Sequence, residues 1–339
     1  MTQAVVFDAF GLENLKWTGY DNPALGDHDV RVKLHAASLN YRDLLMVQGL
    51  YNPKMKHPLV PCSDGAGEVV EVGAAVTDLA VGDRVCSTMI PDWPGGEPGP
   101  NLLRTTLGGP VDGMLAHERV LPQQAWIKFP EYLSYEEAAC LPVAGLTAWS
   151  ALVEDGRLRE KPGAKVVLLG TGGVSMAALA IAKAMDAEVA ITSSSDKKLA
   201  DAAKLGADHS INYRTTPDWH KAVLQVFPHG ADIVIEVGGE GTFDRSVKAC
   251  KVGGFIALIG VLDSQRKPIN LTTCIMKKLS LHGILVGSRA AFADYCAFLD
   301  THRLKPTISR VFDGFDQAPA AFELMARGGH FGKIVLRAG

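Results

Sequence analysis

Residues 165–198 read KVVLLGTGGVSMAALAIAKAMDAEVAITSSSDKK, and this stretch decides the fold. The apolar, β-branched run at 165–169 predicts a strand, and the glycines after it predict a tight turn. Residues 174–185 then predict a helix, and 187–192 a second strand. Backbone N–H groups of such a turn approach a pyrophosphate at the helix N-terminus, where the helix dipole favours anions. The pattern predicts dinucleotide binding, with the following candidate contacts: Gly170, Gly172, Gly173, Val174 and Ser175.

The glycine turn departs from the usual G-x-G-x-x-G pattern at one place, because Ser175 stands where the third glycine is expected. Serine is small enough for close packing of helix on strand, and its hydroxyl could face a phosphate. An alternative remains that the whole turn serves tight packing in an unrelated α/β sheet.

The end of the second strand indicates which nucleotide is bound. An NAD-binding unit usually carries an acidic residue about 20 residues after the glycines, where it holds the ribose 2′-OH. Here that place reads Ser193, Ser194 and Ser195, followed by Asp196-Lys197-Lys198. Hydroxyls and lysines suit a 2′-phosphate, so the sequence favours NADP(H), with Ser193, Ser194 and Lys198 as contacts. The alternative is that Ser195 or Asp196 only caps the next helix.

Length and composition predict a soluble two-domain protein. The chain has 339 residues, of which 47% are hydrophobic and 21% charged, and its net charge of −3 gives no bias toward nucleic acid. The six cysteines form no C-x-x-C pair, which favours a reducing compartment. No signal peptide and no apolar run of about 20 residues is found. We therefore expect a cytoplasmic protein without membrane or nucleic-acid partners.

The chain on either side of the glycine turn has a different character. Up to about residue 122 it predicts short strands separated by Gly, Pro and Asp, with a helical turn at 40–51 and a Gly- and Pro-rich loop at 91–112. After the turn, apolar strands are predicted at 209–213, 231–239, 253–261 and 279–288. Ligands bind at the carboxyl ends of such strands, so Gly238, Gly260 and Val261 are candidate cofactor contacts.

The order of motifs resembles the medium-chain dehydrogenase/reductase superfamily over essentially the whole chain. The motifs are HAASLNYRDLLMVQGLY, SDGAGEVVEVG, VGDRV, AACLPVAGLTAWSAL, the GTGGVS turn and HFGKIVL. The resemblance implies an α/β protein with a GroES-like, β-rich catalytic domain at 1–122 and 290–339. It implies a Rossmann domain with a doubly wound parallel sheet at 123–289, an active site between the two domains, and a homodimer.

The zinc ligands of that superfamily are missing. Zinc alcohol dehydrogenases that resemble this chain place a cysteine where Asn40 stands, a histidine and a glutamate where Ser63 and Asp64 stand, and a third ligand near Val143. Asn, Ser and Val do not make a catalytic zinc site. The cysteine-rich lobe that binds structural zinc should fall in 91–112, which contains no cysteine. We therefore expect no metal.

The SLNYRD and QGLY stretches resemble the zinc-independent quinone-reductase and enoyl-reductase branch. By that resemblance Asn40 and Tyr51 line the substrate cleft near the nicotinamide. Without a metal, charge developing on a substrate oxygen needs hydrogen-bond donors, which an amide and a phenol supply. Tyr51 would also pass a proton to carbon after hydride delivery. The alternatives are that Tyr51 packs on the rim and that Asn40 only caps a helix.

The same resemblance implies further cofactor contacts. Thr147 would lie beside the nicotinamide or diphosphate, Tyr213 would flank the adenosine phosphate with Lys198, and Lys333 would lie near the cofactor. The segment Val286, Gly287 and Ser288 would approach the nicotinamide carboxamide. The alternatives are a buried helix hydroxyl for Thr147 and strand-end packing for Tyr213.

The function that these observations predict is a zinc-independent, NADPH-dependent reductase. Its small-molecule acceptor would be a quinone, an enone or an enoyl compound. One alternative is an NADP-dependent alcohol dehydrogenase or ketone reductase of the same superfamily. The other is a non-catalytic NADPH-binding protein.

Overall fold

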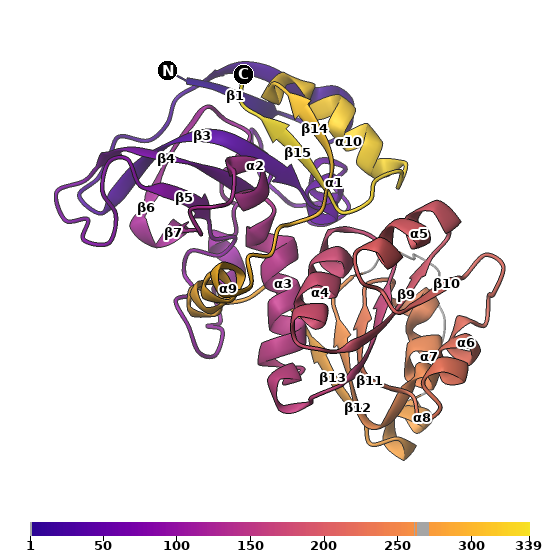
Figure 1. Ribbon diagram of the computed structural model, residues 1–339. Coiled ribbons are helices and arrows are strands. Elements are labelled where there is room, and N and C mark those ends of the chain that lie inside the picture. The colour runs from indigo at the N-terminus through magenta and orange to yellow at the C-terminus, as the bar shows by residue number, and fades with distance from the viewer. Residues whose placement is uncertain (1, 261, 263–270) are drawn as a thin grey trace. The chain divides into compact units, whose positions relative to one another are not determined.

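The computed structural model describes residues 2–260, 262 and 271–339 of the chain (Figure 1). They form two compact units. The first contains the chain up to Leu146 together with Ser288–Gly339, and the second is Thr147–Gly287. Among the described residues, no helix has the length and apolar character needed to cross a membrane.

The second unit is built on one parallel sheet. Its strands are β8 (Lys165–Leu169), β9 (Glu188–Ser193), β10 (His209–Asn212), β11 (Ala231–Glu236), β12 (Cys250–Leu258) and β13 (Ser280–Gly283). The order across the sheet is β10-β9-β8-β11-β12-β13, and all five pairings are parallel. Numbered within the unit this is the 3-2-1-4-5-6 order of a Rossmann fold. The order reverses between β8 and β11, the place where such sheets bind ligands.

Helices connect these strands. They are α4 (Gly173–Ala184), α5 (Asp196–Lys204), α6 (Trp219–Val226), α7 (Glu240–Ala249) and α8 (Leu271–Met276), and helix α3 (Leu146–Trp149) precedes the first strand. Wider π-helical turns, Leu141–Gly145 and Ser150–Glu154, flank α3. Helix α4 turns small and apolar residues such as Ala178 and Leu179 inward, and it contacts β8 and β9. The helix and strands predicted from the quoted stretch are confirmed to within one residue.

The first unit is mainly antiparallel. Its strands are β1 (Thr2–Phe7), β2 (Leu15–Tyr20), β3 (Asp29–Leu39), β4 (Asp64–Val72), β5 (Arg84–Ser87), β6 (Glu118–Pro122), β7 (Trp126–Lys128), β14 (Ile308–Asp313) and β15 (Lys333–Arg337). Strands β1 and β2 form a hairpin, and the larger sheet has the order β14-β15-β3-β4-β5-β7, with β6 also paired to β3. The chain's C-terminal strand β15 thus lies beside β3 (Figure 1).

Four helices and several short 3-10 turns complete this unit. The helices are α1 (Tyr41–Val47), α2 (Tyr135–Ala138), α9 (Arg289–His302) and α10 (Ala318–Ala326). The 3-10 turns are Leu12–Asn14, Leu102–Thr105, Gln123–Ala125 and Phe315–Gln317, with one more in the second unit, Leu158–Glu160. Strand β7 pairs with β5 and α2 contacts β3, so residues 123–146 pack with the first unit. The division therefore differs from the predicted boundary at 122/123, because the crossover carries these elements before the Rossmann sheet begins.

Candidate functional site

The glycine turn of the second unit leaves open space beside its first two glycines, where a side chain would otherwise lie. Gly170 has φ +72°, and a Cβ atom built on Gly170 or Gly172 would meet no atom within 4 Å. The Gly170 N–H donates to Thr192 Oγ1 at 3.2 Å, which ties the turn to β9. Helix α4 begins with Gly173, Val174 and Ser175, whose N–H groups have no acceptor within the helix. This geometry fits a phosphate group at the helix N-terminus.

The Ser175 hydroxyl points away from such a ligand. It is 1% exposed and donates to the Leu169 carbonyl at 2.7 Å. The expectation that this hydroxyl could face a phosphate is therefore wrong, and the packing role is the correct one: the serine joins the first turn of α4 to the end of β8. Only its backbone N–H remains as a candidate contact.

The carboxyl ends of β9 and β10 bring together the residues expected around a 2′-phosphate. The Tyr213 N–H donates to the Ser193 carbonyl at 3.1 Å, and the Tyr213 side chain is 42% exposed. Ser195 caps α5, its Oγ accepting from the Lys198 N–H at 3.4 Å. This cap is compatible with a phosphate contact by the neighbouring residues. Lys198 lies in the first turn of α5, where burial lowers its pKa.

No carboxylate ends β9, although Asp196 follows closely. Its Oδ1 accepts from the Asn212 side chain at 2.6 Å, an interaction that holds it against the end of β10. The Ser193 hydroxyl accepts from the Ser195 N–H at 3.3 Å, and Ser194 is half-buried.

At the end of β11, one buried carboxylate shapes the backbone. Oε1 of Glu236 accepts from the N–H groups of Gly238 at 2.7 Å and Gly239 at 3.0 Å and from Thr242 Oγ1 at 2.6 Å. Its Oε2 accepts from the Ser246 hydroxyl. Gly260, after β12, passes so close that an added Cβ would lie 2.2 Å from the Val237 carbonyl oxygen. Two neighbouring strand ends are therefore glycine-lined, as the sequence predicts.

The remaining expected cofactor residues lie in different settings. Val286 is buried with φ +55°, a conformation that a β-branched residue rarely adopts and that marks a constrained segment. Ser288 caps α9, accepting from the Ala291 N–H at 3.2 Å, and Gly287 lies between them. Thr147 is buried within the helical stretch at 141–154. Val261 lies outside the described residues.

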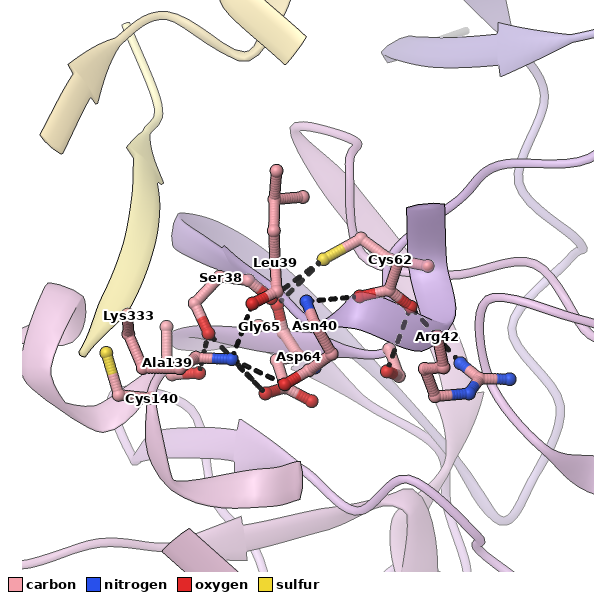
Figure 2. Close-up of polar contacts among 12 residues, drawn as sticks. Ser38, Leu39, Asn40, Arg42, Cys62, Asp64, Gly65, Ala139, Cys140 and Lys333 are labelled. Carbon is pink, nitrogen blue, oxygen red and sulfur yellow. Dashed lines mark hydrogen bonds and ion pairs between the residues drawn. The ribbon is translucent and has the colours of Figure 1, made fainter. Parts of the chain in front are cut away.

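In the first unit, a buried lysine lies at the centre of a polar cluster. Figure 2 shows the Lys333 ammonium directed at the end of β3 and the start of β4. It donates to the Leu39 carbonyl at 2.8 Å, to Asn40 Oδ1 at 2.6 Å and to Asp64 Oδ2 at 3.3 Å. These contacts use all three N–H groups of the ammonium. These partners all belong to the protein, and the expected position of Lys333 near the cofactor stays a prediction.

The carboxylate of this cluster lies fully inside the protein. Burial raises the pKa of Asp64 above its ordinary value, and the Lys333 ammonium acts in the opposite direction. The Ser38 hydroxyl lies 3.4 Å from Asp64 Oδ2 and also donates to the Ala139 carbonyl at 2.7 Å. An ammonium and a carboxylate buried together partly compensate each other's loss of hydration.

A second network holds Asn40 from its backbone. Its N–H donates to Asp43 Oδ2 at 2.8 Å, at the start of α1. The other oxygen of Asp43 lies 3.2 Å from the Arg42 guanidinium and accepts from the Ser63 hydroxyl at 3.3 Å. Arg42 also donates to the carbonyls of Leu107 and Gly109, and its guanidinium carbon lies 5.5 Å from the centre of the Tyr51 ring. Tyr51 itself is 48% exposed.

These groups do not suit a zinc ion. Zinc needs thiolate, imidazole or carboxylate ligands with one open position. Here the Ser63 hydroxyl is bound to Asp43, and Asn40 and Asp64 direct oxygens at an ammonium. Nearby Cys62 is buried, burial raises its pKa well above the ordinary value, and its thiol donates to the Ser38 carbonyl at 3.2 Å. Over residues 2–260, 262 and 271–339, no three His, Cys, Asp or Glu side chains lie together as a metal site.

Sequence reasoning missed the partners of Asn40. Lys333 lies 293 residues from it, and no local pattern joins the two. A usable signal is the short apolar run at 334–336, which indicates a strand but not the strand with which it pairs. Asp43 forms an ion pair with the neighbouring Arg42, and it also accepts from Asn40 and Ser63.

Comparison with known proteins agrees with both units. Residues 26–131 match the alcohol dehydrogenase GroES-like domain, and residues 173–301 match the zinc-binding dehydrogenase family. The chain is 41% identical over 333 residues to the zinc-type alcohol dehydrogenase-like protein C1773.06c of Schizosaccharomyces pombe, covering 96% of each protein. It is 30% identical to the quinone oxidoreductase-like protein 2 homolog of Nematostella vectensis, covering 98% of this chain and 85% of that protein.

A solved structure gives the same result. A protein described as an NAD-dependent alcohol dehydrogenase superposes with a TM-score of 0.90 at 34% identity, over 99% of this chain and all of that one. The two units, the Rossmann strand order and these relatives all indicate the same family. The chain belongs to the medium-chain dehydrogenase/reductase superfamily and is an oxidoreductase of its alcohol dehydrogenase-like group.

Proposed function

We propose that this protein is a zinc-independent, NADPH-dependent reductase acting on a quinone, an enone or an enoyl compound. The observation that carries the proposal is the buried ammonium of Lys333, bound to Asn40 and Asp64 where related enzymes would hold zinc. A metal there would have to displace a charged group that already has three hydrogen-bond partners.

The preference for NADPH rests on the end of β9. Hydroxyls and a lysine stand where a carboxylate would hold the ribose of NAD, and Tyr213 and Lys198 flank the same corner. A 2′-phosphate needs donors and positive charge. The relative described as NAD-dependent makes NADH the direct competitor, so the two nucleotides have to be compared side by side.

The chemistry follows from the donors of the first unit. A nicotinamide cofactor, when bound, supplies the hydride. Asn40 and Tyr51 then donate hydrogen bonds to the acceptor's oxygen as negative charge develops on it. The Tyr51 hydroxyl also gives its proton to the product carbon or oxygen and is reprotonated from water, which its exposure permits.

The second candidate is an NADP-dependent alcohol dehydrogenase or ketone reductase. Both domain matches carry alcohol dehydrogenase or dehydrogenase names, which favours it. The third is a binding protein without turnover. We also propose a cytoplasmic homodimer, since β13 is the edge strand of its sheet and all six cysteines are free thiols.

One acceptor panel separates the candidates. Purified protein is mixed with NADPH and, in turn, quinones, enones, an enoyl thioester, aldehydes and ketones, and loss of the reduced nicotinamide is followed by absorbance. Turnover of C=C or quinone acceptors, with identified reduced product, supports the proposal. Turnover of aldehydes and ketones alone supports the alcohol dehydrogenase, and tight NADPH binding without any turnover supports the binding protein.

A further inference from the structure

The register of three strands brings a buried cation to the Asn40 side chain. Strand β15 pairs with β3 so that Ile334 faces Leu39, and β3 pairs with β4 so that Ser38 faces Asp64. Lys333, one residue before Ile334, therefore reaches the residue that follows β3, which is Asn40. Lys333 is 4% exposed and Asn40 8% exposed, so the contact between them is shielded from water.

This contact fixes which way the amide of Asn40 faces. Its Oδ1 accepts from the Lys333 ammonium at 2.6 Å. A flipped amide would direct its NH₂ group at the ammonium, which can only donate, so the flipped state is excluded. The Nδ2 atom is buried and has no hydrogen-bond partner within the described part of the chain. Burial raises the pKa of the neighbouring Asp64 carboxyl, and the Asn40 side chain has a smaller effect and lowers it. A buried donor without a well-formed hydrogen bond is costly, so the NH₂ group of Asn40 has capacity to donate to a further oxygen atom.

We propose that Lys333 is a positioning residue of the active site, whose ammonium fixes Asn40 with the side-chain oxygen bound and the NH₂ group left to donate to the oxygen of the acceptor. The proposal rests on the proposed reductase function and adds the residue that orients one of its donors. The ammonium also strengthens that donor, since hydrogen bonds in a chain polarise one another. Asp64 is the counter-charge that keeps the ammonium in place.

The rival explanation is a purely structural ion pair between Lys333 and Asp64. The double variant Lys333→Met/Asp64→Asn distinguishes the two, because it removes both buried charges together and avoids leaving either one unpaired. The variant Lys333→Gln/Asp64→Asn keeps one donor near Asn40. The control Lys16→Met/Asp8→Asn removes an exposed Lys–Asp pair from the same unit.

Two readouts are used on the full-length protein. The first is the side-chain NH₂ resonance of Asn40 in protein labelled with ¹⁵N-asparagine, assigned by its loss in Asn40→Ala. The second is kcat with the best acceptor of the panel, with the Kd of NADPH measured in parallel. Thermal melting checks that each variant is folded.

The proposal predicts that Lys333→Met/Asp64→Asn moves the Asn40 resonance toward that of exposed asparagines. It also predicts that kcat falls about tenfold or more with an unchanged Kd for NADPH. Adding Asn40→Ala should lower kcat no further, and Lys333→Gln/Asp64→Asn should recover part of it. An unmoved resonance, or kcat within about twofold of the wild type, overturns the proposal.

If the wild type turns over no acceptor, the reductase function fails instead, and the Asn40 resonance still decides whether Lys333 orients the amide. If Lys333→Met/Asp64→Asn does not fold, Lys333→Gln/Asp64→Asn is measured in its place. The proposal is contradicted if this variant has the same Asn40 resonance and the same kcat as the wild type.

Discussion

At the scale of single residues, Tyr51 makes the sharpest prediction. It follows α1, it is half exposed, and the Arg42 guanidinium lies against its ring. Tyr51→Phe keeps that packing and removes only the hydroxyl. We expect kcat to fall about 10²-fold with the Kd of NADPH unchanged, because a general acid contributes on this order. Stopped-flow and binding measurements check this, with Tyr41→Phe at the start of α1 as the matched control. Equal kcat in the two variants would reduce Tyr51 to a packing residue.

The lysine pair after β9 tests the 2′-phosphate pocket. Lys198→Ala should weaken NADPH by about 10- to 100-fold, as expected for one lost charge-assisted hydrogen bond, and leave NADH nearly unchanged. Lys197 is its exposed neighbour in α5, and Lys197→Ala is the control. Fluorescence titration gives both Kd values. Equal losses for NADPH and NADH in the Lys198 variant would place the phosphate elsewhere.

The burial of Lys198 also leads us to expect that the affinity for NADPH depends on pH. Burial lowers the pKa of Lys198, so in the free protein its ammonium loses its proton earlier than an exposed lysine. Only the protonated form attracts a phosphate. The Kd of NADPH should therefore rise as the pH is raised from about 7 to about 10, while the Kd of NADH changes little. If the ratio of the two Kd values stays constant over this pH range, Lys198 has no role in the preference for NADPH over NADH.

At the scale of elements, the turn between β11 and α7 depends on Glu236. Its carboxylate accepts from two backbone N–H groups and two hydroxyls. In Glu236→Gln an NH₂ group faces some of these donors, so we expect a loss of about 1–3 kcal/mol in the free energy of unfolding. Denaturant titration measures it. The control Asp244→Asn breaks only an exposed ion pair on α7 and should change stability by less than about 0.5 kcal/mol.

Elements with a clear local pattern could be predicted from the sequence. Strand β8 occupies the predicted residues 165–169, and helix α4 begins at the glycines that signalled it. Strand β5 begins only at Arg84, because the chain before it turns: Gly82 has φ +91° and the Ala80 N–H donates to Asp83 Oδ2 at 2.8 Å. The spacing of apolar residues does not give the exact residue at which such a turn ends and a strand begins.

The candidate site was only partly predictable, for a physical reason. Most of the candidate cofactor residues follow strands of one sheet, so the sequence places them by topology. The Asn40 cluster instead joins β3, β4 and β15, which pair through contacts between distant parts of the chain. Nothing near Lys333 in sequence indicates that its ammonium is buried against Asn40 and Asp64.

At the scale of the whole molecule, the chain has a Rossmann unit inserted into a GroES-like unit. The strand order 3-2-1-4-5-6 and the relatives make it a nicotinamide-type dehydrogenase/reductase by family. The finer claim, that this member works with NADPH and without zinc, depends on two corners of the molecule: the end of β9 and the ammonium of Lys333. Both are tested together by catalysis in metal-free protein.

The most direct measurement is kcat/KM for NADPH and for NADH, with the best acceptor of the panel, in protein dialysed exhaustively against a chelator and checked for metal by elemental analysis. We expect full activity after dialysis, no gain on adding zinc, and a preference for NADPH of about tenfold or more. Activity that disappears on dialysis and returns with zinc, or equal kcat/KM values for NADH and NADPH, would contradict the proposed zinc-independent, NADPH-dependent function.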